Sequence, residues 1–198
     1  VSLTAHYDGH DLAESALDNA TGAAAILQIL RTLAPLVGEC ERGLRVSFYT
    51  TEEWGLMGSH RYVNDLTDAE RRAIAVNVNL DTIAGSPNLA CLTSGYVELE
   101  DWVRSVGAEI GQGFRIVRPP KRNSDHYNYA RRGIPALRLV AGFDEPDCRV
   151  GLILTPADTR DKAPAAELKN GTMAAAAMVW RALNQPGPVA PHKTDEEA

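Results

Sequence analysis

Two adjacent glutamates, Glu52 and Glu53, directly follow an alternating apolar run of Leu44, Val46 and Phe48 that is typical of a β-strand. Neighbouring carboxylates repel each other, so a fold keeps them together only where a cation, a proton or water compensates their charge. A metal site is one explanation of the pair, and a solvated loop with two unrelated acids is the other. The other chemistry-bearing residues of the chain decide between the two.

Three further residues of metal-binding type stand at the ends of other elements. His6 ends a strand pattern over residues 2–6, Asp18 opens the first helix, and Asp81 ends a strand pattern over residues 75–80. Alone, each has an ordinary explanation as a surface histidine, a helix cap or a turn acid. Ligands of open α/β sheets bind outside the carboxyl ends of the strands, so we expect these side chains to converge. Their agreement favours a metal site.

The chemistry of zinc explains these residue types. Zinc binds imidazole nitrogen and carboxylate oxygen, and catalytic sites leave one position open for water. Asp18 could bridge two ions about 3.5 to 4 Å apart, one activating water and the other binding the reacting carbonyl. Consecutive residues point in different directions, so Glu53 can face a metal while Glu52 acts as the general base. Asp8, two residues after His6, either fixes the imidazole tautomer by a hydrogen bond or is a plain turn acid.

Composition bounds the class of protein. A chain of 198 residues, 44% apolar and 23% charged, suits one sizeable α/β domain and is too ordinary for a disordered or fibrous protein. The net charge of −6 argues against a nucleic-acid partner, so small-molecule or peptide substrates fit better. No apolar stretch is long enough to cross a membrane, so we expect a soluble protein. The cysteines are odd in number and widely spaced, which indicates neither a zinc knuckle nor a disulfide framework: Cys40, Cys91 and Cys148.

Strand and helix patterns alternate along the chain and must position these residues. Strand-like runs occupy residues 2–6, 44–50, 75–80 and 135–140, with a weaker one at 89–93; helical patterns occupy residues 23–34, 66–74, 99–110, 124–133 and 163–183. This alternation predicts an α/β fold with a largely parallel sheet and helices on both faces.

We expect one domain over residues 1–185 and a disordered or extended tail over residues 186–198, where His192 is solvated. The chain starts inside a strand pattern without Met or a signal peptide, so we expect the start to be truncated. The compartment and the oligomeric state stay open.

An ordered set of six motifs is similar to one known family: HYDGHD, DNATGAAAILQIL, TEEWGLMGSHRYV, NLDTIAG, SDHYNYARRGIPAL and TPADTRDK. Over residues 1 to about 183 the chain resembles the di-zinc exopeptidases of metallopeptidase family 28, which includes leucine-type aminopeptidases, glutamate carboxypeptidases and glutaminyl cyclases. The resemblance implies a three-layer α/β/α sandwich with a mostly parallel mixed sheet, and strands upstream of Val1. It also implies a zinc-dependent exopeptidase, aminopeptidase-like, acting on a peptide or aminoacyl substrate.

Carried over residue by residue, the resemblance implies four zinc ligands: His6, Asp18, Glu53 and Asp81. Asp18 would bridge the two ions, and Glu52 would be the general base. The family's last zinc-ligand histidine falls on Leu154, which cannot bind zinc. Two zinc ions are therefore expected by resemblance, but one or none stays open. A second hypothesis also stays open, in which the chain is a catalytically impaired relative that serves as a binding or structural module.

The SDHYNY segment is implied to line the substrate cleft. His126 is the best candidate to replace the missing ligand, with a pocket-wall histidine as the alternative, and Ser124 and Asp125 would contact substrate or organise the cleft. Four aromatic residues either line a hydrophobic pocket or pack in the core: Trp54, Tyr127, Tyr129 and Phe143. Cations just before the segment leave a carboxypeptidase open: Arg118, Lys121 and Arg122. His10 and His60 are expected to be structural or surface groups.

Overall fold

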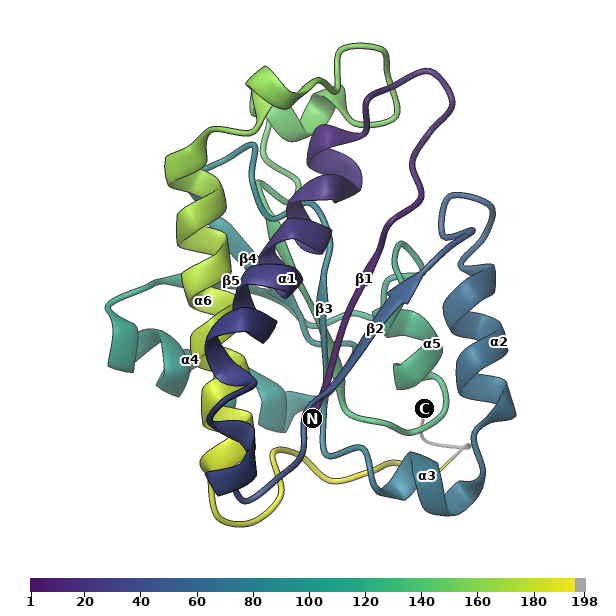
Figure 1. Cartoon of the computed structure of the whole chain (residues 1–198), viewed down its shortest axis with the longest axis vertical. Helices are drawn as coiled ribbons and strands as arrows, with labels where there is room; N and C mark the ends of the chain where they lie inside the picture. The colour runs from purple at the N-terminus through teal and green to yellow at the C-terminus, as the bar shows by residue number, and fades with distance from the viewer. Residues whose placement is uncertain (195–198) are drawn as a thin grey trace.

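A six-stranded mixed sheet forms the centre of the computed structural model, which describes residues 1–194 (Figure 1). Its strands are β1 (Ser2–His6), β2 (Arg45–Tyr49), β3 (Asn77–Leu80), β4 (Leu89–Leu92), β5 (Phe114–Val117) and β6 (Ala136–Ala141), in the order β2-β1-β3-β6-β4-β5. β2, β1, β3 and β6 are parallel, whereas β4 pairs antiparallel with β6 and parallel with β5. The expected mostly parallel mixed sheet is confirmed.

The strand runs predicted from sequence correspond to β1, β2, β3, β4 and β6. The weaker run at residues 89–93 is also confirmed, as β4. The sequence prediction has no counterpart to β5, because its four residues, with Arg115 exposed among apolar neighbours, give too short an alternation to stand out.

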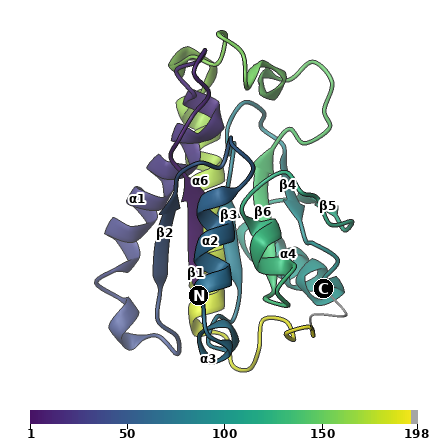
Figure 2. The same cartoon turned by 90° about the vertical axis from the view of Figure 1, so that its right-hand side faces the viewer.

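Helices cover both faces of the sheet (Figure 1 and Figure 2). α1 (Thr21–Leu33), α4 (Val97–Ile110) and α6 (Ala165–Asn184) pack together on one face, and α2 (Met57–Asp65) and α5 (His126–Ala130) lie together on the other. α3 (Asp68–Arg72) follows α2. α1 shows why these segments are helical and where they pack, since Ile26, Ile29 and Leu33 recur at helical spacing and are buried while Leu27 is exposed.

The two faces of the sheet differ in chemistry, because side chains alternate along each strand. The face under α1 and α6 is apolar, with Leu3, Val78 and Leu137 side by side in register. The opposite face carries buried polar groups, where the Thr4 hydroxyl donates to Oδ1 of Asn79 at 2.8 Å. This polar face leads to the carboxyl ends of β1 and β3, so it places polar and ionisable side chains at that edge of the sheet.

Asp18 does not open the first helix as the sequence pattern predicts. It lies in a π-helical turn, Ala16–Ala20, that precedes α1, and its own backbone is non-helical (φ −114°, ψ 91°). The Asp18–Asn19 peptide bond is cis. A turn of this kind has no signature in the sequence, whereas the apolar spacing of α1 beyond it does.

The segment after α6 forms neither helix nor strand up to residue 194. Val189 and Ala190 are buried, and the Lys193 backbone N–H donates to the Gly133 carbonyl at 2.9 Å. His192 is exposed, with Nε2 3.2 Å from a backbone carbonyl oxygen. The remainder of the predicted tail, residues 195–198, lies outside the described residues. Within residues 1–194, no helix combines the length and apolar character needed to cross a membrane.

Candidate metal centre

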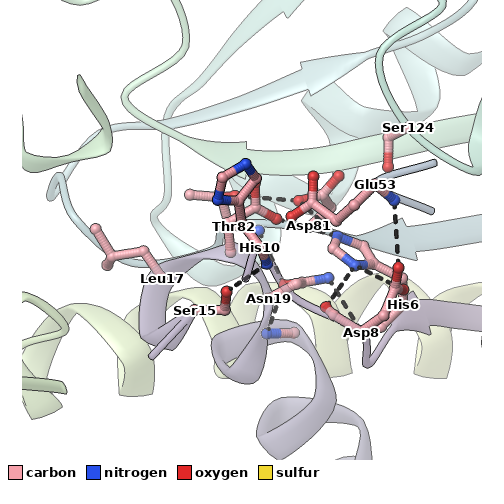
Figure 3. Close-up of polar contacts among 12 residues, drawn as sticks. His6, Asp8, His10, Ser15, Leu17, Asn19, Glu53, Asp81, Thr82 and Ser124 are labelled. Carbon is pink, nitrogen blue, oxygen red and sulfur yellow. Dashed lines mark hydrogen bonds and ion pairs between the residues drawn. The ribbon is translucent and has the colours of Figure 1, made fainter. Parts of the chain in front are cut away.

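His6, Asp18 and Asp81 meet at the carboxyl edge of β1 and β3, where Figure 3 shows the His6 ring and the Asp81 carboxylate close together. Nε2 of His6 lies 3.1 Å from Oδ1 of Asp18 and 3.6 Å from Oδ1 of Asp81. All three residues are buried. The convergence expected from three distant segments of the sequence is therefore present.

The geometry of this group fits a zinc ion. Nε2 of His6 and Oδ1 of Asp18 are shielded from solvent, yet neither makes a hydrogen bond with a residue in the described part of the chain. A tetrahedral zinc ion, with bonds of about 2.0 to 2.1 Å, holds its ligand atoms about 3.3 Å apart. The spacings of 3.1 and 3.6 Å bracket that value. One imidazole nitrogen and two carboxylate oxygens are also donors that zinc accepts.

Asp8 lies against the other ring nitrogen of His6 (Figure 3). Nδ1 of His6 is 3.2 Å from the Asp8 carbonyl oxygen and 3.5 Å from its Oδ1. A proton on Nδ1 that donates to these oxygens leaves the Nε2 lone pair free for a metal. Oδ2 of Asp8 also accepts a hydrogen bond from the Glu53 backbone N–H at 3.3 Å. Asp8 thus connects the histidine to the loop of the glutamate pair.

The turn that carries Asp18 is held by Asp158, a residue that the sequence reasoning missed. The fully buried carboxylate of Asp158 accepts hydrogen bonds from the backbone N–H of Leu17 at 2.7 Å and of Asp18 at 3.1 Å. The TPADT motif that contains Asp158 was the available signal. The Asp158 carboxylate binds backbone groups about 140 residues away in sequence, and no local sequence pattern reveals such a contact.

Asn19 is a second missed residue, and it ties the same turn to β3. Its side-chain amide donates to the Leu80 carbonyl at 2.9 Å, and its Oδ1 accepts from the backbone N–H of Gly22 and of Thr82. Gly22 approaches so closely that a Cβ there would lie 2.4 Å from the Leu80 oxygen. Asp18 and Asp81 are therefore fixed relative to each other by one amide.

Glu52 and Glu53 are half-buried and lie outside the close group of His6, Asp18 and Asp81. Burial, followed by repulsion from Asp81, raises the pKa of Glu52 to about 9, and burial with repulsion from Asp18 raises the pKa of Glu53 to about 7. Such crowding of acids is relieved when a cation binds among them, because a nearby positive charge favours the ionised form.

Charges also shift the pKa values inside the close group. Burial and Asp81 together raise the pKa of Asp18. Burial alone would lower the pKa of His6, but the adjacent carboxylates outweigh it and raise it to about 12. Burial alone would raise the pKa of Asp81, but the Arg138 guanidinium beside it holds that pKa well below its usual range.

Ser124, Asp125 and His126 are fully buried at the start of α5. Burial raises the pKa of Asp125 to about 6. Burial and the charge of Arg138 lower the pKa of His126 to about 3, so its imidazole is neutral at pH 7. The structure does not bring His126 into the close group with His6, Asp18 and Asp81.

Leu154 is 48% exposed and adopts the left-handed backbone region (φ 61°).

The four aromatic residues have different surroundings. Tyr129 packs in the core with its hydroxyl 2.5 Å from that of Tyr49, and Phe143 packs against a small cluster around Val140. Trp54 is 73% exposed, and Tyr127 lies under the Arg122 guanidinium, 5.2 Å from its ring centroid.

An α/β fold with an imidazole and two carboxylates at the carboxyl edge of its parallel strands belongs to the class of domains that can hold a catalytic metal ion there. The model of peptidase family M28 matches residues 1–179, and the chain belongs to that family.

Aminopeptidase YwaD of Bacillus subtilis (strain 168) is 28% identical over 192 residues, a match that covers 93% of this chain and 41% of YwaD. Leupeptin-inactivating enzyme 1 of Streptomyces exfoliatus is 32% identical over 133 residues, covering 64% of this chain and 29% of that enzyme. The chain therefore spans less than half the length of these relatives.

Two solved structures share the fold. BSAP, a zinc aminopeptidase from Bacillus subtilis, superposes with a TM-score of 0.81 at 24% identity, covering 98% of this chain and 49% of that one. The LapA aminopeptidase of Legionella pneumophila gives a TM-score of 0.80 at 20% identity, covering 94% of this chain and 52% of LapA. The three-layer α/β/α architecture is thereby established.

Proposed function

We propose that this chain carries the metal centre of a zinc-dependent exopeptidase of the aminopeptidase type. One observation carries the proposal: Nε2 of His6 and Oδ1 of Asp18 lie 3.1 Å apart, buried and without hydrogen bonds to residues 1–194. Two ligands of one cation are spaced in this way. The names of the relatives, among them aminopeptidase YwaD, support the reaction class.

His6, Asp18 and Asp81 are the proposed ligands of one zinc ion, and Glu53 is the ligand that a second ion would use. Zinc in this centre supplies a Lewis acid that polarises a carbonyl and lowers the pKa of water. Glu52 takes the proton of the attacking water and passes it to the leaving amine. Positive charge in the centre lowers the raised pKa of Glu52, so that its carboxylate is ionised and can accept that proton. Asp8 orients the His6 ring.

The cleft beside Glu53 supports an aminopeptidase over a carboxypeptidase. It has a volume of about 240 Å³ and is lined by Gly9, His10, Asp11, Glu53 and Trp54. The carboxylate of Asp11 suits a substrate's free ammonium group, and the exposed Trp54 ring offers an apolar surface to a side chain. Among the cations near the SDHYNY segment, Arg118 pairs with Glu100 and Arg122 lies over an aromatic ring.

The test compares Glu52→Gln with the unaltered protein on aminoacyl 4-nitroanilides, with zinc content measured by plasma emission. We expect kcat to fall by at least about 100-fold, the scale of a lost general base, while zinc per chain is unchanged. Glu41→Gln, at an exposed surface position, is the matched control and should keep full activity. Activity that survives Glu52→Gln would overturn the assigned base.

Leu154 is the observation that favours the second candidate, a catalytically impaired relative that binds or supports other molecules. The same measurements separate the two. Turnover with at least one zinc per chain supports the hydrolase. No turnover, with one zinc per chain or none, overturns it in favour of the impaired relative.

A further inference from the structure

Arg138 places a buried guanidinium directly beside the candidate metal centre. The residue is 6% exposed in the middle of β6. Its Nη1 donates to the Asn123 carbonyl at 2.7 Å, and its Nη2 lies 3.1 Å from Oδ1 of Asp81. Its Nε makes no hydrogen bond within the part of the chain that the structure describes. Asp81 is therefore the carboxylate that forms an ion pair with this arginine.

The sheet register explains why the side chain cannot turn to solvent. Arg138 lies opposite Asn79 of β3 and Leu92 of β4, on the polar face of the sheet. Asp81, two residues beyond Asn79, continues along the same face, and α5 packs against both β3 and β6 there. A charge buried in this way is costly unless a counter-charge lies against it. Arg138 and Asp81 are thus coupled in the folded protein.

One carboxylate oxygen of Asp81 faces both the Arg138 guanidinium and the imidazole nitrogen that is proposed to bind zinc. Oδ1 of Asp81 is 3.1 Å from Nη2 of Arg138 and 3.6 Å from Nε2 of His6, the nitrogen proposed to bind zinc. A zinc ion held by His6 and Asp81 would share Oδ1 of Asp81 with the guanidinium, and two positive charges brought together in a poorly solvated site would repel each other. The guanidinium and a metal therefore compete for the negative charge of Asp81.

We propose that Arg138 is a built-in cation that stabilises the metal-free centre and weakens its affinity for zinc. The inference rests on the proposed zinc site. It predicts two effects of opposite sign: removal of the arginine charge makes the metal-free protein less stable and the zinc complex tighter. Substitution of a residue that only supports the fold would lower both the stability of the metal-free protein and the affinity for zinc.

The experiment removes the charge in two ways. Arg138→Gln keeps a polar side chain with an NH2 donor, and Arg138→Met keeps an unbranched apolar stem without the guanidinium. Zinc affinity is measured by competition with a chromophoric chelator, and the melting temperature is measured in excess EDTA. We expect both neutral variants to bind zinc at least tenfold more tightly than the unaltered protein and to melt at lower temperature in EDTA.

Two controls fix the interpretation. Arg138→Lys keeps the charge and should retain the original zinc affinity within a few-fold. Arg115→Gln removes a half-exposed arginine of β5 that pairs with Asp144, and should change neither quantity.

Unchanged or weaker zinc binding by the neutral variants, with the unaltered protein binding zinc, overturns the role of Arg138 alone. Absence of zinc binding by every protein, the unaltered one included, overturns the proposed function together with this inference. If neither neutral variant folds with zinc in excess, the proposal also fails, because zinc should replace the missing positive charge.

Discussion

Asp158→Asn tests whether a distant carboxylate holds the turn that carries Asp18. In the native structure the two oxygens of Asp158 accept hydrogen bonds from the backbone N–H of Leu17 and of Asp18, and the residue is fully buried. Asparagine has nearly the same shape but only one acceptor oxygen. Its NH2 group would face the second backbone N–H, which would then lack a partner in a buried position.

The magnitude follows from these two contacts. A hydrogen bond to a charged acceptor contributes about 1.5–3 kcal/mol, and a buried N–H left without a partner costs about 1–3 kcal/mol. Losing one such bond lowers the free energy of unfolding by about 2–4 kcal/mol. For a chain of 198 residues, each kcal/mol shifts the melting temperature by about 2–4 °C, so the expected decrease is about 5–15 °C.

The assay is thermal unfolding with and without zinc, paired with a zinc-affinity measurement. We also expect zinc affinity to fall at least tenfold, because the backbone of a proposed ligand loses its support. Asp161→Asn is the matched control, three residues further on, exposed and paired only with Lys162 and Thr159 among the described residues. It should shift the melting temperature by less than about 2 °C. An Asp158→Asn protein that melts and binds zinc like its parent refutes the argument.

Two other substitutions test separate features. Gly22→Ala should lower the melting temperature by several degrees, because its Cβ would lie 2.4 Å from the Leu80 oxygen, whereas Gly38→Ala, with no atom within 4 Å, should not. Asp125→Asn should stabilise the protein above pH 6 and not at pH 4. Burial raises the pKa of Asp125 to about 6, so the unaltered protein loses stability as the pH rises from about 4 to 6, whereas the asparagine variant does not. Unfolding curves recorded in EDTA across that pH range measure the difference.

The sequence predicts best what depends on local pattern. Apolar alternation located β1, β2, β3 and β6, and the residues following β1 and β3 could be assigned to one sheet edge because the carboxyl ends of parallel strands meet there. His6 and Asp81 follow directly from that rule. Asp18 was also predicted, but in the wrong backbone setting, since a π-helical turn leaves no periodic signal.

Residues that act through distant contacts could not be predicted in this way. Asp158 acts on backbone groups that only the folded chain brings near it. Arg138 stands in an apolar strand pattern, where an isolated arginine is typical of an exposed position. Its burial depends on α5 and on its pairing with Asp81, which are properties of the tertiary structure.

We infer that Leu154 and Arg138 both limit how many metal ions the proposed centre can hold. Leu154 stands where the family resemblance places a histidine ligand of the ion proposed for Glu53, and Arg138 adds a fixed positive charge beside Asp81. A second divalent ion would therefore have fewer ligands and would also meet a cation already present. His6, Asp18 and Asp81 keep a complete set of donors for one ion, with Glu52 as the proposed base. We therefore expect the centre to work with one zinc ion, since a single open-sided zinc and one general base are sufficient for hydrolysis of an amide.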